Sequence, residues 1–376
     1  MEWRVPLADL DFGEEETQAI QSVLSSKWLT MGEVTKHFEN EFAKLAHSKF
    51  AFAVSNATQA LHLACLALGI GPGDEVIVPS LSFVATANAV LYCGADVRFA
   101  EIISPEDLTI DPQSITQQIT PKTKAIIVMH YAGFPCRVHE IMSLAAEHNL
   151  PVIEDAAHAP GAILDGKPLG TWGDVGCFSF FSNKNLATGE GGMITCQRED
   201  LAEKFKLLRS HGMTSLTYDR HQGHAFSYDV VDLGYNYRID EIRSALGLEQ
   251  LQKLPQNNAE RARLTHAYWH ALKGLDLTLP FSKTGQGVPA HHIFPILLPT
   301  SVNRHTFMTQ LRDAGIQSSI HYRPIHTFTY YVNRYGQQSL PLTEEVAKRE
   351  VTLPLYPTMG DGKLQYVVNA VKEILQ

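Results

Sequence analysis

The sequence has few cysteines, and none of them forms a paired metal-binding or redox motif. Five cysteines occur in 376 residues, and no CxxC is present. Cys65, Cys93 and Cys177 lie in apolar surroundings, so we expect reduced, mostly buried thiols and a cytoplasmic protein. The histidines show no spacing comparable to a zinc motif, and we expect no metal site.

Long apolar segments and basic clusters are also missing. No stretch reaches membrane-spanning length, and the opening residues, MEWRVPLADLDF, lack the apolar core of a signal peptide. The formal net charge is -9 without a basic run, which argues against nucleic acid as a partner. We therefore expect no membrane and no nucleic-acid partner, and small molecules as ligands. The length suits one large domain plus a smaller one.

Strands alternating with helices dominate the first half of the chain. Strands are predicted at 52–54, 74–79, 96–100, 124–129 and 150–154, and helices at 13–27, 34–46, 59–68, 81–92, 112–119 and 138–148. This alternation predicts βαβ units and an α/β fold with a mostly parallel central sheet between helices. Ligands of such sheets bind beyond the carboxyl ends of the strands.

The sequence pattern changes near residues 245–255. Two successive helices are predicted at 240–254 and 257–272, followed by strands at 292–298 and 316–320 around a helix at 303–314. An aromatic, basic loop at 321–338 and helices at 343–348 and 362–375 complete the chain. We predict a large domain over 1–250 and a smaller C-terminal α/β domain over 251–376.

The stretch Trp172–Cys196 carries the strongest chemical signal. Two apolar runs, Val175–Phe181 and Met193–Cys196, flank a polar turn with Lys184 and a cluster of glycines. The pattern predicts strand, tight turn and strand, with a close backbone approach. A solvated hairpin lysine is the alternative, but the glycines and the Ser179 hydroxyl argue against it. A partly desolvated lysine has a lowered pKa and can form a Schiff base, so we hypothesise that Lys184 holds pyridoxal phosphate (PLP).

A carboxylate ends the predicted strand 150–154. Asp155 is followed by small residues and His158. An ionised Asp155 would keep a pyridinium nitrogen protonated, which makes PLP an electron sink. A helix N-cap explains this aspartate equally well.

Further candidates are found on turns. Ser55-Asn56-Ala57-Thr58 links a strand to a helix and offers N–H groups and hydroxyls to a phosphate, although such residues are also ordinary N-caps. Phe83, at a predicted helix start, could lie over a planar ring or in the core. Residues 213–230 lack periodicity and predict a surface or active-site loop.

Seven segments together match one family. They are 28–32 (WLTMG), 55–62 (SNATQALH), 79–86 (PSLSFVAT), 153–161 (IEDAAHAPG), 178–192 (FSFFSNKNLATGEGG), 234–247 (GYNYRIDEIRSALG) and 321–326 (HYRPIH). The sequence resembles the DegT/DnrJ/EryC1/StrS group of PLP-dependent aminotransferases, which are nucleotide-sugar aminotransferases of fold type I (aspartate aminotransferase-like).

The resemblance implies a cofactor site. Lys184 is the implied Schiff-base lysine and Asp155 the partner of the pyridinium nitrogen. The other implied cofactor contacts are His158 near the phenolic oxygen, Phe83 on the ring, Ala57, Thr58, Gln59 and Ser179 at the phosphate, and Asn236, which reaches the phosphate of the neighbouring subunit. Arg238, His321 and Tyr322 are implied contacts to substrate or neighbour. The chain departs from its relatives at Asn56 and Gln59, beside the phosphate.

The implied activity moves an amino group from L-glutamate, or glutamine, to a keto sugar, with pyridoxamine phosphate (PMP) as the intermediate form of the cofactor. A nucleotide-activated sugar and a homodimer with a shared active site are favoured. Alternatives are an aminotransferase for a cyclic ketone without a nucleotide, a sugar dehydratase and a PLP-binding regulator without turnover. Relatives that became dehydratases replace the lysine by histidine, so Lys184 favours transamination.

Overall fold

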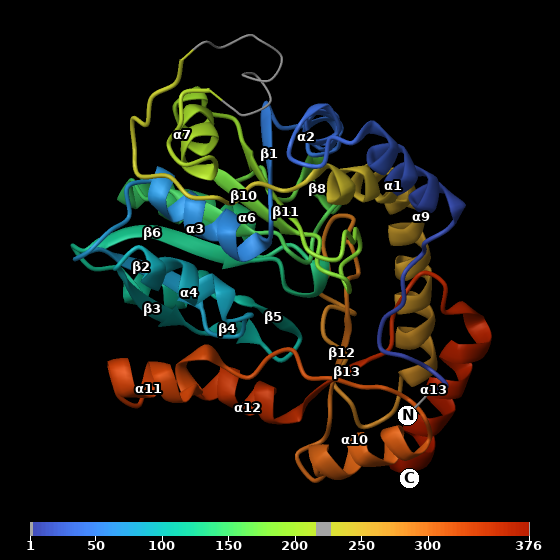
Figure 1. The fold of residues 1–376 in the computed structure, drawn as a ribbon. Helices are drawn as coiled ribbons and strands as arrows, with labels where there is room; N and C mark the ends of the chain where they lie inside the picture. Colours follow the sequence, from blue (N-terminus) through green and yellow to red (C-terminus); the bar gives the residue numbers. More distant parts are fainter. Residues whose placement is uncertain (1–2, 216–226, 376) are drawn as a thin grey trace.

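The computed structural model describes residues 3–215 and 227–375 (Figure 1). The loop predicted at 213–230 therefore lies largely outside the described residues. At its two described ends, Met213 forms an antiparallel bridge with Val230.

A seven-stranded sheet forms the centre of the fold. Its strands are β1 (Phe50–Val54), β2 (Glu75–Pro79), β3 (Asp96–Ala100), β6 (Thr123–Met129), β7 (Val152–Asp155), β10 (Val175–Ser179) and β11 (Gly192–Cys196). Their order across the sheet is β1-β11-β10-β7-β6-β2-β3. Neighbours from β10 to β3 run parallel, whereas β11 is antiparallel to β1 and β10. The prediction of an α/β fold with a mostly parallel sheet is confirmed.

Helices cover both faces of this sheet. The first layer consists of α3 (Ala57–Ala67), α4 (Ala85–Tyr92) and α7 (Glu199–Arg209), and the second of α2 (Glu33–Leu45), α5 (Pro112–Gln118) and α6 (Val138–His148). Successive residues of a strand pack against the two helix layers alternately, because side chains point to opposite faces of the sheet in turn. In β2, Val76 and Val78 pack in the first layer and Ile77 in the second.

One long helix, α9 (Glu241–Leu272), replaces the two helices predicted at 240–254 and 257–272. Pro255 lies inside it, although proline usually interrupts a helix by removing one backbone hydrogen bond. Buried residues on both sides of Pro255, Leu254 and Leu264 among them, keep the helix continuous against the rest of the chain. The predicted domain boundary at 250/251 falls within this helix.

The first residue of α9 also fixes a neighbouring helix. The Glu241 carboxylate is buried and accepts hydrogen bonds from the backbone N–H groups of Gly32, Val34 and Thr35 over 2.8–2.9 Å. It therefore caps the start of α2, and α9 packs against both α2 and α1 (Glu14–Ser26).

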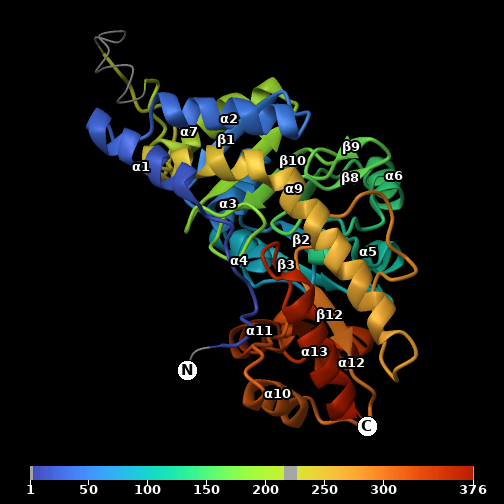
Figure 2. The ribbon, with the colours of Figure 1, turned by 90° about the vertical axis from the view of Figure 1, so that its right-hand side faces the viewer.

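A second apolar core lies at the C-terminal end of α9 (Figure 2). It contains the antiparallel pair β12 (Phe294–Leu297) and β13 (Glu350–Leu353), with α10 (Arg304–Asp313) and α13 (Gly360–Leu375). The strand predicted at 316–320 forms only isolated bridges, at Ile316 and Ser319.

Several short elements have no counterpart in the prediction. The loop predicted at 321–338 contains η2 (Ile325–Thr327) and α11 (Thr329–Tyr335), whereas α12 (Pro341–Arg349) corresponds to the helix predicted at 343–348. The hairpins β4 (Ile102–Ser104) with β5 (Asp107–Ile110) and β8 (Ile163–Leu164) with β9 (Lys167–Pro168) were not predicted, nor was η1 (Tyr131–Gly133).

Candidate active site

A cavity of about 650 Å³ opens beyond the carboxyl ends of β6, β7 and β10. The sequence-predicted residues in its wall are Ala57, Thr58, Gln59, Phe83, Asp155, His158, Ser179, Lys184, His321 and Tyr322. Residues of the wall that were not predicted include Tyr92, Asn183, Glu190 and Tyr237. The volume is that of a small-molecule site.

Lys184 lies on the turn between β10 and β11, and the turn is fixed by its own backbone. The Lys184 N–H donates to the carbonyl of Phe181 over 2.8 Å. Burial lowers the pKa of the Lys184 amine to about 8, against the opposing effect of the Asp155 charge. About a tenth of the amine is therefore unprotonated at pH 7, far more than for a lysine with the usual pKa of 10.5, and the unprotonated amine is the form that attacks an aldehyde.

Asp155 is the last residue of β7, and its carboxylate is held from two sides. Oδ2 accepts from the Thr86 hydroxyl over 2.7 Å, and Oδ1 accepts from the Ala157 N–H over 3.2 Å. Burial raises the pKa of Asp155, and these two hydrogen bonds oppose the rise. No helix begins here, so the N-cap alternative is wrong. A buried carboxylate facing a cavity favours a cationic ligand atom.

The start of α3 forms another part of the wall. Asn56 is the N-cap, and its Oδ1 accepts from the Gln59 N–H over 3.0 Å, so the helix begins two residues before the predicted Gln59. Gly192 pairs with Ser179 across β10 and β11, and a Cβ on Gly192 would lie 2.8 Å from the Ala57 nitrogen. The glycine thus brings the Ser179 hydroxyl beside a helix N-terminus, which attracts anions.

His158 and Tyr322 form a polar pair in the cavity. His158 Nδ1 accepts from the Ala132 N–H over 3.3 Å, and its Nε2 lies 2.9 Å from the Tyr322 hydroxyl. Burial lowers the pKa of His158 well below its usual value, so the ring is neutral. A neutral ring that accepts at Nδ1 carries its proton on Nε2. Tyr322 therefore accepts from His158, and its own proton is available to a ligand.

A second histidine is backed by a network that the sequence did not reveal. His321 Nδ1 lies 2.8 Å from Thr352 Oγ1, and the Thr352 hydroxyl donates to Glu350 Oε1 over 2.6 Å. Because the Thr352 proton goes to Glu350, Thr352 accepts the Nδ1 proton of His321. Burial lowers the pKa of His321 to about 3, so the His321 ring is neutral and its Nε2 carries the lone pair.

Asn236 and Arg238 do not line this cavity. Asn236 is exposed and bridges Ser210, whereas Arg238 is half-buried, and its carbonyl accepts from the Ser55 hydroxyl over 2.7 Å. Phe83 does reach the cavity, 55% exposed, but it precedes α4 rather than starting it.

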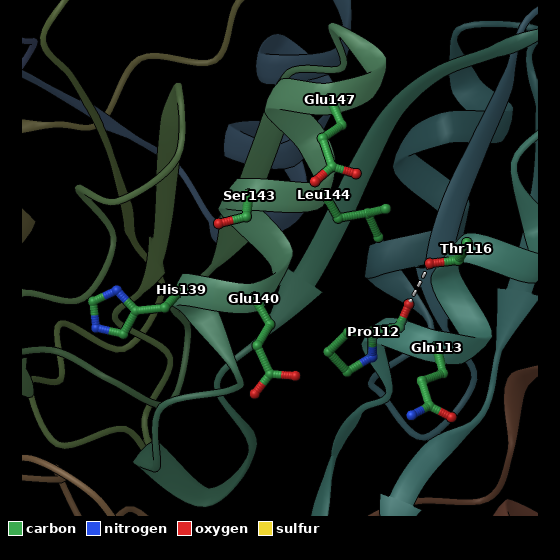
Figure 3. A pocket seen from close by; sticks show the side chains of 8 residues that line it. All are labelled: Pro112, Gln113, Thr116, His139, Glu140, Ser143, Leu144 and Glu147. Carbon is green, nitrogen blue, oxygen red and sulfur yellow. Dashed lines mark hydrogen bonds between the residues drawn. The ribbon is translucent and has the colours of Figure 1, made fainter.

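A separate hollow of about 440 Å³ lies between α5 and α6 (Figure 3). Thr116 donates there to the carbonyl of Pro112, within α5 itself. His139, Glu140, Ser143 and Glu147 are spread along the face of α6, without the convergence that chemistry requires. The large cavity is therefore the candidate active site.

The residues of the large cavity fit PLP. An amine of lowered pKa suits the aldehyde, a buried carboxylate suits the ring nitrogen, and a helix N-terminus with hydroxyls suits the phosphate. Two amide oxygens in the wall, Gln59 Oε1 and Asn183 Oδ1, are buried without a hydrogen-bond partner among the described residues. A ligand in the cavity that donates hydrogen bonds would satisfy these two acceptors.

This fold and site define a class of enzyme, the PLP-dependent aminotransferases. Within that class, the chain belongs to the DegT/DnrJ/EryC1/StrS aminotransferase family, whose model matches residues 10–372.

Three relatives show how far the similarity extends. The chain is 37% identical over 372 residues to the spore coat polysaccharide biosynthesis protein SpsC of Bacillus subtilis (strain 168), covering 97% of this chain and 95% of SpsC. It matches Helicobacter pylori PseC, an aminotransferase involved in the biosynthesis of pseudoaminic acid, with a TM-score of 0.92, 29% identity and coverage of 100% and 99%. The PMP form of the putative sugar aminotransferase Spr1654 of Streptococcus pneumoniae matches with a TM-score of 0.93, 27% identity and 99% coverage of both chains. Spr1654 is also known in a PLP form.

Two general features complete the description. Among residues 3–215 and 227–375, no three His, Cys, Asp or Glu side chains are grouped to hold a metal ion. Over the same ranges, no helix combines the length and the apolar character needed to cross a membrane.

Proposed function

We propose that this enzyme transfers an amino group from L-glutamate, or from L-glutamine, to a keto sugar, and that a nucleotide-activated sugar is its acceptor. The observation that carries the proposal is the convergence of Lys184, Asp155 and the start of α3 on one cavity. SpsC belongs to spore coat polysaccharide biosynthesis and PseC to pseudoaminic acid biosynthesis, and both support a sugar as the acceptor.

Each part of the cavity wall has a proposed contact with PLP. The Asp155 carboxylate pairs with the ring nitrogen, and Phe83 packs on the ring. The Tyr322 hydroxyl, held by His158, donates to the phenolic oxygen. Bound in this way, PLP supplies an electron sink for the negative charge that develops at the donor Cα. The phosphate is held by Ala57, Thr58, Gln59 and Ser179, at the α3 N-terminus.

Lys184 is the proposed acid and base. Its amine removes the proton from the donor Cα and returns a proton in the second half of the reaction. A pKa of about 8 suits both directions, since it lies close to the working pH. Proton transfer by a positioned side chain contributes about 10²- to 10⁴-fold to a rate. Donor and acceptor use the cavity in turn, so the kinetics are ping-pong.

The remaining predicted residues belong to the acceptor and to a second subunit. We propose that His321 and Arg238 contact the acceptor, and that the exposed Asn236 reaches the phosphate site of a partner in a homodimer. The five cysteines are free, and they favour a reducing compartment, the cytoplasm.

The visible spectrum of the PLP-loaded protein tests the donor half-reaction. L-glutamate should remove the band of bound PLP, and 2-oxoglutarate should restore it. The Lys184→Ala variant should lose transamination, whereas Lys122→Ala, which changes an exposed lysine outside the cavity, should behave as wild type. If neither glutamate nor glutamine changed the band, the proposal that one of them is the amino donor would be wrong.

The acceptor is tested after the donor. The aminated protein is offered a UDP- or dTDP-linked ketosugar and, separately, scyllo-inosose. Transfer to the nucleotide-linked sugar is expected. If only scyllo-inosose accepted the amino group, the acceptor would be a cyclic ketone without a nucleotide and not the proposed keto sugar.

A further inference from the structure

A histidine outside the recognised motifs contacts the reactive lysine. His292 lies two residues before the start of β12 (Phe294–Leu297), and its Nε2 lies 3.5 Å from the Lys184 Nζ. The His292 ring is buried, and its centroid lies 4.3 Å from the centroid of the His158 ring. His292 is thus enclosed between the lysine and another residue of the cavity wall.

The tautomer of His292 follows from the hydrogen bonds of Asn185. The Asn185 amide nitrogen donates to the Ala290 carbonyl over 2.7 Å and to Asn258 Oδ1 over 2.8 Å. Both amide protons are therefore used, and Asn185 Oδ1 can only accept. Since Oδ1 lies 2.9 Å from His292 Nδ1, that nitrogen carries the proton and Nε2 faces Lys184 with a lone pair.

The ring is fixed in place at its backbone as well. The His292 N–H donates to the Ala132 carbonyl over 2.8 Å, and the His292 carbonyl accepts from the buried Arg261 guanidinium over 3.1 Å. Asn185 cannot pass a proton on, so the chain of hydrogen bonds ends there. The arrangement suits a fixed acceptor and not a proton relay.

We propose that His292 is a positioning residue for Lys184. Its Nε2 accepts an N–H of the Lys184 amine and so aims the amine lone pair into the cavity, toward the donor Cα. The inference rests on the proposed role of Lys184 and deepens it. Burial keeps the pKa of His292 well below its usual value, so the ring remains a neutral acceptor throughout.

Three variants separate the hydrogen bond from the packing. His292→Phe keeps a ring against His158 but removes the acceptor, and His292→Leu is a second variant without one. His292→Gln retains a side-chain acceptor and should restore function. The matched control is His291→Asn, because His291 is also buried but packs on Phe134, 5.1 Å between ring centres.

The first readout needs no cofactor. The cofactor-free protein is reductively methylated at several pH values, and peptide mass spectrometry measures the methylation of Lys184. The pH at which methylation reaches half of its maximum is the midpoint, which reports the pKa of the Lys184 amine. The titratable groups that act on its amine are Asp155, His158, His321 and His292. Losing a neutral acceptor disfavours the ammonium form, so the midpoint should fall from about 8 in His292→Phe, and it should recover in His292→Gln.

The second readout is the donor half-reaction. His292→Phe should lower its rate constant by about 10- to 100-fold with little change in the donor KM, because misplaced reacting groups slow chemistry more than binding. The inference would be overturned if both His292→Phe and His292→Leu kept the wild-type methylation midpoint and the wild-type rate constant. It would also be overturned if His292→Gln lost as much rate as His292→Phe. Transamination that survives Lys184→Ala would instead overturn the proposed function, whatever the His292 variants show.

Discussion

The Thr86 hydroxyl donates to Oδ2 of Asp155 over 2.7 Å, from the first turn of α4 to the end of β7. Ser82 Oγ lies 2.6 Å behind Thr86 Oγ1. Because the Thr86 proton is used on Asp155, Ser82 donates to Thr86 and not to the Met129 sulfur, which also lies within reach at 3.1 Å. Two hydroxyls in series thus support one buried carboxylate, and the hydrogen bonds within such a chain polarise one another.

Thr86→Val should raise the pKa of Asp155 further, since the lost hydrogen bond lowers it in the wild type. The carboxylate would then ionise only at higher pH, and the acid limb of the kcat/KM profile should move upward by about one pH unit. Thr265→Val is the control, because the buried Thr265 hydroxyl has no partner among the described residues. An acid limb that stays in place would show that Thr86 does not act on Asp155.

Tyr322→Phe should weaken PLP binding by about tenfold, because one hydrogen bond is lost and the His158 Nε2–H is left without its acceptor. Fluorescence titration of the cofactor-free protein with PLP measures the change. Tyr331→Phe removes a hydroxyl that donates to Asn88 outside the cavity and should leave the affinity unchanged. Equal affinities for the two variants would exclude Tyr322 from the cofactor site.

Gly192→Ala should destabilise the protein and weaken PLP binding together. The added Cβ would lie 2.7 Å from the Asn56 carbonyl carbon, so the start of α3 would have to move. Overpacking of this kind costs about 1–3 kcal/mol. Gly71→Ala has no atom within 4 Å of the new Cβ and serves as the control in thermal unfolding. A Gly192→Ala protein as stable as Gly71→Ala would contradict this close approach.

Lys184 should make the stability of the cofactor-free protein depend on pH. Its pKa falls from the usual 10.5 to about 8 in the folded state, so between these values the unfolded chain binds more protons. Stability should therefore rise with pH from about 8 to 10.5, relative to Lys184→Met. Urea unfolding of both proteins across this range measures the difference. A difference that is constant with pH would mean that the folded lysine has an ordinary pKa.

The residues that sequence could identify are those with a local signal. Lys184 stands on a glycine-rich turn between two apolar strands, and Asp155 ends a predicted strand. Thr86 and His292 were not predicted as site residues, although Thr86 ends the matched segment 79–86. Their partners, Asp155 and Lys184, lie 69 and 108 residues away in the sequence, so these contacts arise only when the chain folds.

The same distinction explains the errors in the elements. Pro255 is a reliable local signal for a helix end, but buried side chains on both sides of it keep α9 continuous. The start of α3 differs from the prediction because Asn56 is the N-cap and the helix begins at Ala57. In each case the prediction used propensity, and packing or capping determined the outcome.

The length of α9 has a consequence for how this enzyme can evolve. With 32 residues it spans about 48 Å. Glu241 at one end caps α2, Asn258 near the middle holds Asn185 beside Lys184, and Leu272 at the other end enters the C-terminal core. A chimera joined at residue 250/251 would combine helix halves from two parents and mismatch these contacts. New acceptor preferences should therefore arise by substitution around the cavity and not by exchange of residues 251–376 as a module.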